Sequence, residues 1–359
     1  MSATEALQPG AGAIRAPHYL PSTPHEVLWG RLPCATDEPV LTVHAGSEVT
    51  IDTLSHEGLL DDQGSDPVAF FGGFGVPADA VLADAIALTA TRTRGADDGP
   101  HVVTGPIFVE SALPGDLLKI TVLEATPRVP YGVISNRHGR GALPDEFPQG
   151  EANVSVFAAV DGPMEQAQYG TMPRVLGGEH SVRFPLAPFL GIMGVAVAGD
   201  QRPHSVPPGA HGGNIDINLL TVGSTLYLPV QVPGALAYVG DPHFAQGDGE
   251  VALTALEASL RATLRFRLVT ADDPFAPFVH EHGPVVETPE YWVPTGMHED
   301  LREAMKNAVR ASIRFLVGGY EMDEEHAYAY LSAATDFDIS QVVDRVTGVH
   351  ARIRKADFG

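Results

Sequence analysis

Short runs of alternating apolar and polar residues, bounded by glycine or proline, constrain the fold of this chain more than any other feature. Such runs occupy residues 39–44, 48–52 and 117–123. A period of two places the apolar side chains on one face of a strand, and the 38 glycines and 30 prolines can supply the turns between runs. The sequence therefore predicts a mainly β protein. Residues 131–176 have no clear period, and we expect long loops there.

A helical period appears only toward the C-terminus. Apolar residues recur at spacings of three and four over residues 301–316, and a second, shorter pattern covers 323–334. We therefore predict three parts. Residues 1–16 form a flexible arm, residues 17–270 a β-rich catalytic domain, and residues 271–359 a smaller α+β part packed on that domain.

The charge of the chain argues against several classes of partner. With 45 Asp and Glu against 22 Lys and Arg, the net charge of −23 repels phosphate backbones and anionic lipid surfaces. We expect no nucleic-acid and no membrane partner, and a neutral or cationic substrate or a metal ion instead. Cys34 is the single cysteine, and the sequence has neither a signal-peptide pattern nor a long apolar run. These features predict a cytoplasmic protein.

Two segments concentrate the residues that can do chemistry: 208–218, which reads PGAHGGNIDIN, and 240–250, which reads GDPHFAQGDGE. Asp241 and His243 are two apart, so in an extended segment both side chains point to one side and can meet one Zn²⁺ at about 2.0–2.2 Å. The alternation from residue 214 to 219 predicts a strand with Asp216 on its polar face. We predict Asp216 as the third metal ligand.

Acid–base groups flank these ligands. Asp248 and Glu250 repeat the spacing of two, and a glutamate beside a metal-bound water is a common general base. His101 lies between two Gly-Pro breaks, which present its ring rather than pack it. His56 and Glu57 form a weaker version of the same arrangement.

Other interpretations of these residues stay open. Asp, Asn and Gly also gather in turns for backbone reasons, and carboxylate-rich ligation suits Ca²⁺ as well as Zn²⁺. A non-catalytic β-sandwich binding protein with a structural Ca²⁺ is therefore an alternative. The sequence has no Gly-x-Ser-x-Gly elbow, no phosphate loop and no dinucleotide fingerprint, and Cys34 has no activating neighbour. For a hydrolase, metal-activated water is the chemistry that remains.

Several motifs of this chain resemble the acetamidase/formamidase family. They are 104–110 (TGPIFVE), 114–116, 189–195 (FLGIMGV), 211–216 (HGGNID), 228–236, 240–243 (GDPH), 246–250 (QGDGE), 287–289, and 327–336. The resemblance covers nearly the whole chain from about His18. It implies a jelly-roll-like β-sandwich with a smaller α+β part, hydrolysis of a short aliphatic amide to a carboxylate and ammonia, a homo-oligomer, and a divalent metal in some members.

The resemblance also implies roles for particular residues. It would place Asp216, Asp241 and His243 around the metal, and His101, Asp248 and Glu250 near the reacting amide. For the metal itself we expect Zn²⁺, with Ca²⁺ as the alternative. We expect His211, Asn214 and Glu287, which lie in matching motifs, to bind the substrate. Hydrolysis of another C–N bond, in a cyclic imide or a carbamate, is a further alternative. The insertion-like loop at 132–140 is expected to enlarge the pocket.

Overall fold

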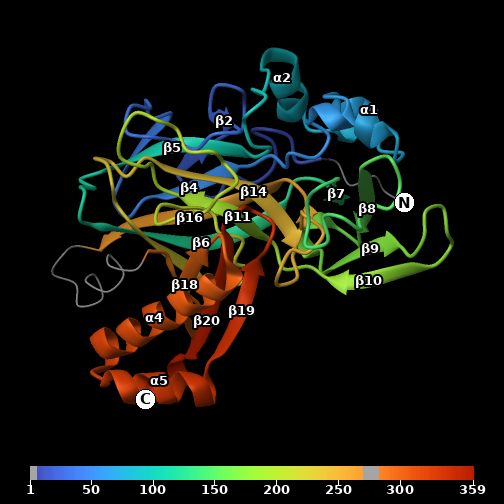
Figure 1. Cartoon of the computed structure of the whole chain (residues 1–359). Helices are drawn as coiled ribbons and strands as arrows, with labels where there is room; N and C mark the ends of the chain where they lie inside the picture. The colour runs from blue at the N-terminus through green and yellow to red at the C-terminus, as the bar shows by residue number, and fades with distance from the viewer. Residues whose placement is uncertain (1–5, 270–282) are drawn as a thin grey trace.

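Two large β-sheets make up most of the protein, in a computed structural model that describes residues 6–269 and 283–359 (Figure 1). Within these residues the first sheet has nine strands, in the order β1-β4-β16-β6-β13-β17-β18-β20-β19. Their bounds are β1 His18–Leu20, β4 Glu48–Asp52, β16 Leu260–Val269, β6 Leu117–Pro127, β13 Thr225–Pro229, β17 Val285–Glu287, β18 Tyr291–His298, β20 Thr347–Arg354 and β19 Asp336–Gln341.

The second sheet has eleven strands among the described residues, with the path β10-β9-β8-β7-β15-β14-β11-β12. Strand β5 pairs with β14 and carries β2 and β3 at its other side. The bounds are β10 Ser181–Pro185, β9 Tyr169–Pro173, β8 Val154–Val160, β7 Tyr131–Asn136, β15 Leu256–Glu257, β14 Ala237–Ala245, β11 Phe189–Gly194, β12 Gly212–Asn214, β5 Val102–Glu110, β2 Val27–Trp29 and β3 Leu41–His44.

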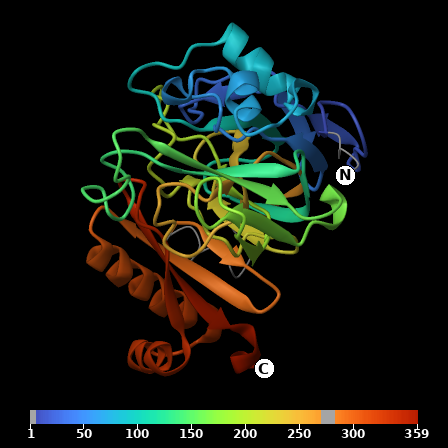
Figure 2. The ribbon, with the colours of Figure 1, turned by 90° about the vertical axis from the view of Figure 1, so that its right-hand side faces the viewer.

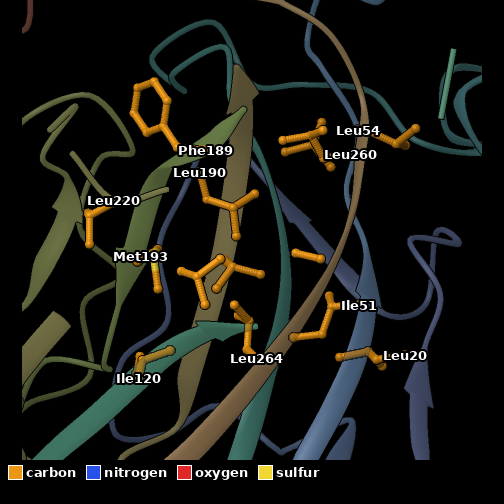
Figure 3. Close-up of a cluster of buried hydrophobic side chains, with 14 of the residues drawn as sticks. Leu20, Ile51, Leu54, Ile120, Phe189, Leu190, Met193, Leu220, Leu260 and Leu264 are labelled. Carbon is orange, nitrogen blue, oxygen red and sulfur yellow. The ribbon is translucent and has the colours of Figure 1, made fainter. Parts of the chain in front are cut away.

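The core lies between the two sheets and joins them. Leu20, Ile51 and Leu264 come from the first sheet, and Leu190 and Met193 come from β11 of the second. All five are at most 3% exposed, and Figure 3 shows them in one continuous cluster. Burial of the inner faces of both sheets is the main stabilisation of such a sandwich. The predicted β-sandwich class is confirmed.

Helices cover the ends of the sandwich and one face of the C-terminal strands (Figures 1 and 2). Their bounds are α1 Pro67–Gly72, α2 Ala83–Thr91, α4 Leu301–Tyr320 and α5 Glu324–Ala334, and short 3₁₀ turns cover Asp61–Gln63, Ala78–Ala80, Met164–Gln166 and Lys355–Phe358. Helix α4 packs on β18 and β20, where a Cβ atom at Gly296 would lie 2.0 Å from the Ala308 nitrogen. Over residues 6–269 and 283–359, no helix is both long enough and apolar enough to cross a bilayer.

The predicted elements match the structure where one strand face is apolar. The alternating runs at 39–44, 48–52 and 117–123 became β3, β4 and β6, and the two helical patterns became α4 and α5. The prediction of long loops over 131–176 is wrong, because β7, β8 and β9 lie there. In β7 the buried face includes the polar Ser135 and the other face includes the apolar Ile134, so no alternation of polarity marks this strand.

The predicted arm and domain boundary fall partly outside the described residues, which exclude 1–5 and 270–282. Residues 6–16 run along the sandwich: the Arg261 guanidinium donates to the carbonyl oxygens of Ala11 and Ala13 and pairs with Asp52 of β4. The first sheet continues from β13 through β17 into β18 without interruption. The division into a catalytic domain and a C-terminal part stays a prediction.

Candidate functional site

A group of buried carboxylates and imidazoles surrounds Gly191 on β11. A Cβ atom at Gly191 would lie 2.4 Å from Asp216 Oδ1, 2.7 Å from His243 Cε1 and 2.8 Å from Asp241 Oδ2. Such contacts are too short for any side chain, so glycine is what allows the three groups to approach each other here. The three predicted metal ligands therefore converge on one point of the second sheet.

Asp241 has an imidazole on three sides. Its Oδ1 lies 3.6 Å from His56 Nδ1 and 3.8 Å from His101 Nε2, and its Oδ2 lies 3.1 Å from His243 Nε2. His56 follows β4, His101 precedes β5, and Asp241 and His243 lie on β14. Strand pairing therefore assembles this group from both sheets.

His243 links Asp241 to further carboxylates. Its Nε2 lies 3.0 Å from Glu257 Oε1, and its Nδ1 lies 4.0 Å from Asp216 Oδ1. His243 and Glu257 are cross-strand partners on β14 and β15. Three overlapping sets have ligand atoms within 4.8 Å of one another: His56, His101 and Asp241; Asp216, His243 and Glu250; and Asp241, His243 and Glu257. We call these seven residues the buried cluster.

Three acids of the buried cluster sit in strained backbone. Asp216, Asp241 and Glu250 have φ of 47°, 50° and 48°, in the left-handed region that costs a non-glycine residue about 1 kcal/mol or more. The predicted strand over 214–219 is wrong for this reason: β12 ends at Asn214, and the amides of Ile215 and Asp216 turn to the Gly191 carbonyl. Such outliers gather at functional sites, which favours a site over an ordinary turn.

Burial and mutual charge shift the titration of the buried cluster in both directions. Burial and the neighbouring Asp216 raise the pKa of Glu250 well above its usual value, and burial lowers the pKa of His101 to about 4. Burial alone would raise the pKa of Asp241, but the neighbouring His101 and His243 hold it well below its usual value. His56 keeps its proton because Asp241 and Glu57 outweigh its burial and raise its pKa to about 10.

The polar atoms of the buried cluster are poorly satisfied by the protein itself. Both carboxylate oxygens of Asp216, both ring nitrogens of His243 and Oδ1 of Asp241 are buried without a hydrogen-bond partner in the part of the chain that the structure describes. Native proteins leave few such atoms, and each costs about 1–3 kcal/mol. Two ligands about 2.1 Å from a tetrahedral ion lie roughly 3.4 Å apart, and the separations of 3.0–4.0 Å observed in the buried cluster bracket that value. The residues therefore fit a divalent cation.

A cavity of about 710 Å³ leads from the surface to the buried cluster. His101, Asn214, Asp241 and Glu250 line its inner end, together with His56 and Glu257. Its outer end, which we call the rim, carries the charged residues Asp61, Asp62, Arg94, Asp97, Asp98, Arg137, Arg140 and Arg345. The cluster is thus reachable by a small molecule.

The remaining predicted site residues lie away from this cavity wall. Asp248 accepts a hydrogen bond from Asn218 Nδ2 at 3.1 Å. His211 is half-buried beside Gly213, and its buried Nε2 has no hydrogen-bond partner among the described residues. Glu287 on β17 accepts from Tyr227 and from Lys355 at 2.8 Å, which with Lys119 lowers its pKa. The geometry does not bring these three side chains to Asp241.

Sequence reasoning missed two acidic members of the site, Glu257 and Asp344, and undervalued His56 and Glu57. Glu257 is a lone acid in an apolar strand, which is itself a signal because such residues are rarely buried without a partner. Glu57 accepts from Ser135 and lies 3.3 Å from His56 Nε2. Asp344 lies in the turn between β19 and β20, and no local pattern points to it; burial and Glu250 raise its pKa.

The C-terminal hairpin supports the site directly. The amide of Gly249 donates to Ser340, and the amide of Val342 donates back to Gly249. Figure 1 shows β19 and β20 running from the C-terminal helices toward β14. The segment that carries Glu250 is therefore held between the sandwich and this hairpin.

Comparison with known proteins agrees with this architecture. The profile of the Acetamidase/Formamidase family matches residues 96–203 and 198–352. An acetamidase from Bacillus halodurans has a similar solved structure, with a TM-score of 0.72 at 23% identity over 95% of this chain and 98% of that one. This structural likeness shows a shared fold.

Two curated proteins are similar in sequence over part of their length. An acetamidase from Mycolicibacterium smegmatis is 31% identical over 212 residues, which are 45% of this chain and 52% of that protein. A formamidase from Methylophilus methylotrophus is 30% identical over 192 residues, 42% of this chain and 47% of that protein. The matched region spans about half the length of each relative.

Proposed function

Because this chain belongs to the acetamidase/formamidase family, we propose that it hydrolyses short linear amides to a carboxylate and ammonia at the buried cluster. The observation that carries this proposal is the convergence of Asp216, Asp241 and His243 at Gly191, with Asp241 lining the inner end of a cavity. No serine elbow or activated cysteine competes for the role of nucleophile in the sequence. Water is therefore the proposed attacking group.

We propose that Asp216, Asp241 and His243 hold a divalent cation, with Glu257 as a neighbouring carboxylate. A bound Zn²⁺ supplies Lewis-acid polarisation of a carbonyl and lowers the pKa of water. Carboxylates outnumber imidazoles in this set, so Ca²⁺ is the alternative ion. The unsatisfied atoms of Asp216 and His243 support a cation over a purely hydrogen-bonded network.

Glu250 is the proposed proton carrier. It lines the cavity and is buried, and its raised pKa lets the carboxyl group hold a proton closer to neutral pH than an ordinary glutamate does. The carboxylate takes the proton of the attacking water and returns it to the leaving nitrogen, which must depart as ammonia rather than as an amide anion.

His101 is the proposed partner of the amide oxygen. Its Nδ1 lies 3.0 Å from Ser205 Oγ, and if that hydroxyl donates, the ring proton sits on Nε2. The lowered pKa of His101, about 4, keeps the ring neutral. A neutral donor at this position can stabilise a developing oxyanion by roughly 3 kcal/mol. Asn214, also in the cavity wall, is proposed to contact the substrate.

Metal content and ammonia release test the proposal together. The purified protein is assayed on formamide, acetamide and propionamide before and after chelation, and its metals are measured by mass spectrometry. We expect turnover that falls on chelation and returns with the metal. Glu250→Gln should abolish ammonia release while metal remains, whereas loss of both would make Glu250 a ligand.

The alternatives predict different results in the same assay. Calcium bound without turnover of any amide would favour a non-catalytic binding protein. Turnover of a cyclic imide or a carbamate, with none of a linear amide, would support the proposed attack by water but assign a different C–N bond as the one hydrolysed. Light scattering of the same preparation tests the predicted homo-oligomer, and cell fractionation tests the predicted cytoplasmic location.

A further inference from the structure

The cavity is larger than a formamide or acetamide site requires, and its rim carries four arginines beside four aspartates. Its volume of about 710 Å³ falls among pockets that hold ligands of drug-like size, roughly 300–1,000 Å³. Four arginines line it in a chain with a net charge of −23. The overall charge predicts a neutral or cationic substrate, so the local charge of the cavity is a separate signal.

Two of the four arginines are neutralised within the rim. Arg137 Nε lies 2.8 Å from Asp62, and its Nη2 lies 3.2 Å from the buried Glu57. Arg94 Nη2 lies 3.4 Å from Asp61. These pairs position the rim but leave little charge for a ligand.

Arg140 and Arg345 differ from the other two. Both are exposed at the cavity wall, and neither has a carboxylate within ion-pairing distance in the described parts of the chain. Asp98 of the rim already faces Arg31 at 2.6 Å. Asp97 is an exposed residue of the rim, and its carboxylate contacts neither Arg140 nor Arg345.

These two arginines reach the cavity from segments far apart in sequence. The loop that carries Arg140 rests on residues 251–252, since the amide of Ala142 donates to the Val251 carbonyl at 2.8 Å. The hairpin that carries Arg345 rests on Gly249, since Val342 donates to it at 3.2 Å. The segment between these contacts holds Glu250. The positive charges of Arg345 and Arg140 also help to lower the pKa of His204 in the same wall, after its burial.

We propose that this enzyme prefers amides that carry a carboxylate at the far end of the acyl chain, and that Arg140 and Arg345 bind that carboxylate. The proposal rests on the amide hydrolase function proposed above and narrows its substrate class to monoamides of short dicarboxylic acids. Arginine suits this role because its planar fork pairs with a carboxylate through two hydrogen bonds.

The reaction balances without any additional reactant. Water adds to the amide carbon of the monoamide, the C–N bond breaks, and the nitrogen leaves as ammonia, which is protonated to ammonium. One carboxylate monoamide and one water give one dicarboxylate and one ammonium ion. The distal carboxylate is unchanged, so it can anchor the substrate throughout.

The test compares succinamate with butyramide, a neutral amide of similar length, in the metal-loaded protein. We expect a higher kcat/KM for succinamate, and this advantage should shrink as salt screens the arginines. Arg140→Gln and Arg345→Gln should each raise KM for succinamate about five-fold and leave KM for butyramide unchanged. Arg302→Gln, an exposed charge change on α4, is the matched control and should alter neither substrate.

Binding of succinate, the product, gives a readout that needs no turnover. Calorimetry should show tighter succinate binding to the wild type than to the double variant Arg140→Gln/Arg345→Gln. Equal binding, or equal losses for succinamate and butyramide, would overturn the proposed specificity. If no amide is hydrolysed while the difference in succinate binding persists, the proposed function fails and the carboxylate site stands.

Discussion

The buried cluster and the rim of the cavity are both rich in charge, but they satisfy it in different ways. At the rim, Asp61, Asp62 and Asp98 each face an arginine within 3.4 Å. In the buried cluster, Asp216 and His243 have buried polar atoms without hydrogen-bond partners. An exposed pair is worth about 0–1 kcal/mol, whereas unpaired buried groups cost more. The three paired aspartates of the rim are therefore neutralised by the protein itself, whereas the buried cluster keeps groups that could hold a metal ion.

The sharpest test of this difference is Asp241→Asn. The amide keeps the shape of the side chain but removes the charge that His56, His101 and His243 surround. We expect bound metal and ammonia release to fall at least about 100-fold. Asp97→Asn at the exposed rim is the matched control and should leave both unchanged. An Asp241→Asn protein with full metal content and turnover would remove the distinction between the two regions.

Gly191→Ala tests whether the predicted metal ligands must converge, and it leaves the ligand residues themselves unmutated. The added methyl group would lie 2.4 Å from Asp216 Oδ1, so the ligands must shift. A displacement of about 1 Å can cost on the order of 100-fold in rate, and we expect that loss in kcat/KM. Gly72→Ala in α1, where nothing lies within 4 Å, is the control. Normal kinetics in Gly191→Ala would show that the cluster tolerates a looser geometry.

The pH dependence of stability tests Glu57, which contacts both His56 of the buried cluster and Arg137 of the rim. Burial opposes ionisation of Glu57, but His56 and Arg137 prevail and lower its pKa from 4.5 to about 2. A lowered pKa means that the stabilisation is present above pH 4.5 and is lost as the pH falls toward 2. We expect wild type to lose about 3 kcal/mol more than Glu57→Gln over this range.

Urea unfolding of both proteins from pH 5 to pH 2 measures this difference. Glu250 contributes with the opposite sign, because its raised pKa means that protonation on acidification favours the folded state. The comparison with Glu57→Gln cancels that contribution. Parallel curves for the two proteins would mean that Glu57 is not held by its partners.

The smallest of the predicted effects is a loss of stability when a charge pair of the rim is broken. Asp62→Asn weakens the contact with Arg137 Nε at 2.8 Å, where the Asp62 side chain is 31% exposed. We expect the free energy of unfolding to fall by about 0.5–1 kcal/mol, measured by urea titration at neutral pH. A loss of several kcal/mol would place the rim in the same energetic class as the buried cluster.

The sequence predicted secondary structure correctly where apolar residues repeat along one face of a strand or helix. Strands β4 and β6 were predicted because apolar and polar residues alternate over 48–52 and 117–123. Asp241 and His243 were predicted because their spacing of two is preserved in β14. The pattern failed after Asn214, because a left-handed residue at Asp216 ends the strand and turns the chain toward Gly191.

The rest of the site depends on pairing between distant segments. Glu257 meets His243 only through the β14–β15 pairing, and Asp344 arrives on the β19–β20 hairpin. His56 follows β4 of the first sheet, and Asp241 lies on β14 of the second. These two residues meet only because the two sheets pack together. No local spacing in the sequence predicts these contacts. The sequence therefore identified part of the candidate site, and the other residues became visible only in the fold.

The left-handed backbone at Asp216, Asp241 and Glu250 has a consequence for laboratory evolution. Glycine adopts that conformation at no steric cost, so replacement of any of the three acids would relax the chain. A library selected for heat resistance alone should accumulate glycine at these positions, while a library selected for growth on an amide as nitrogen source should retain the acids.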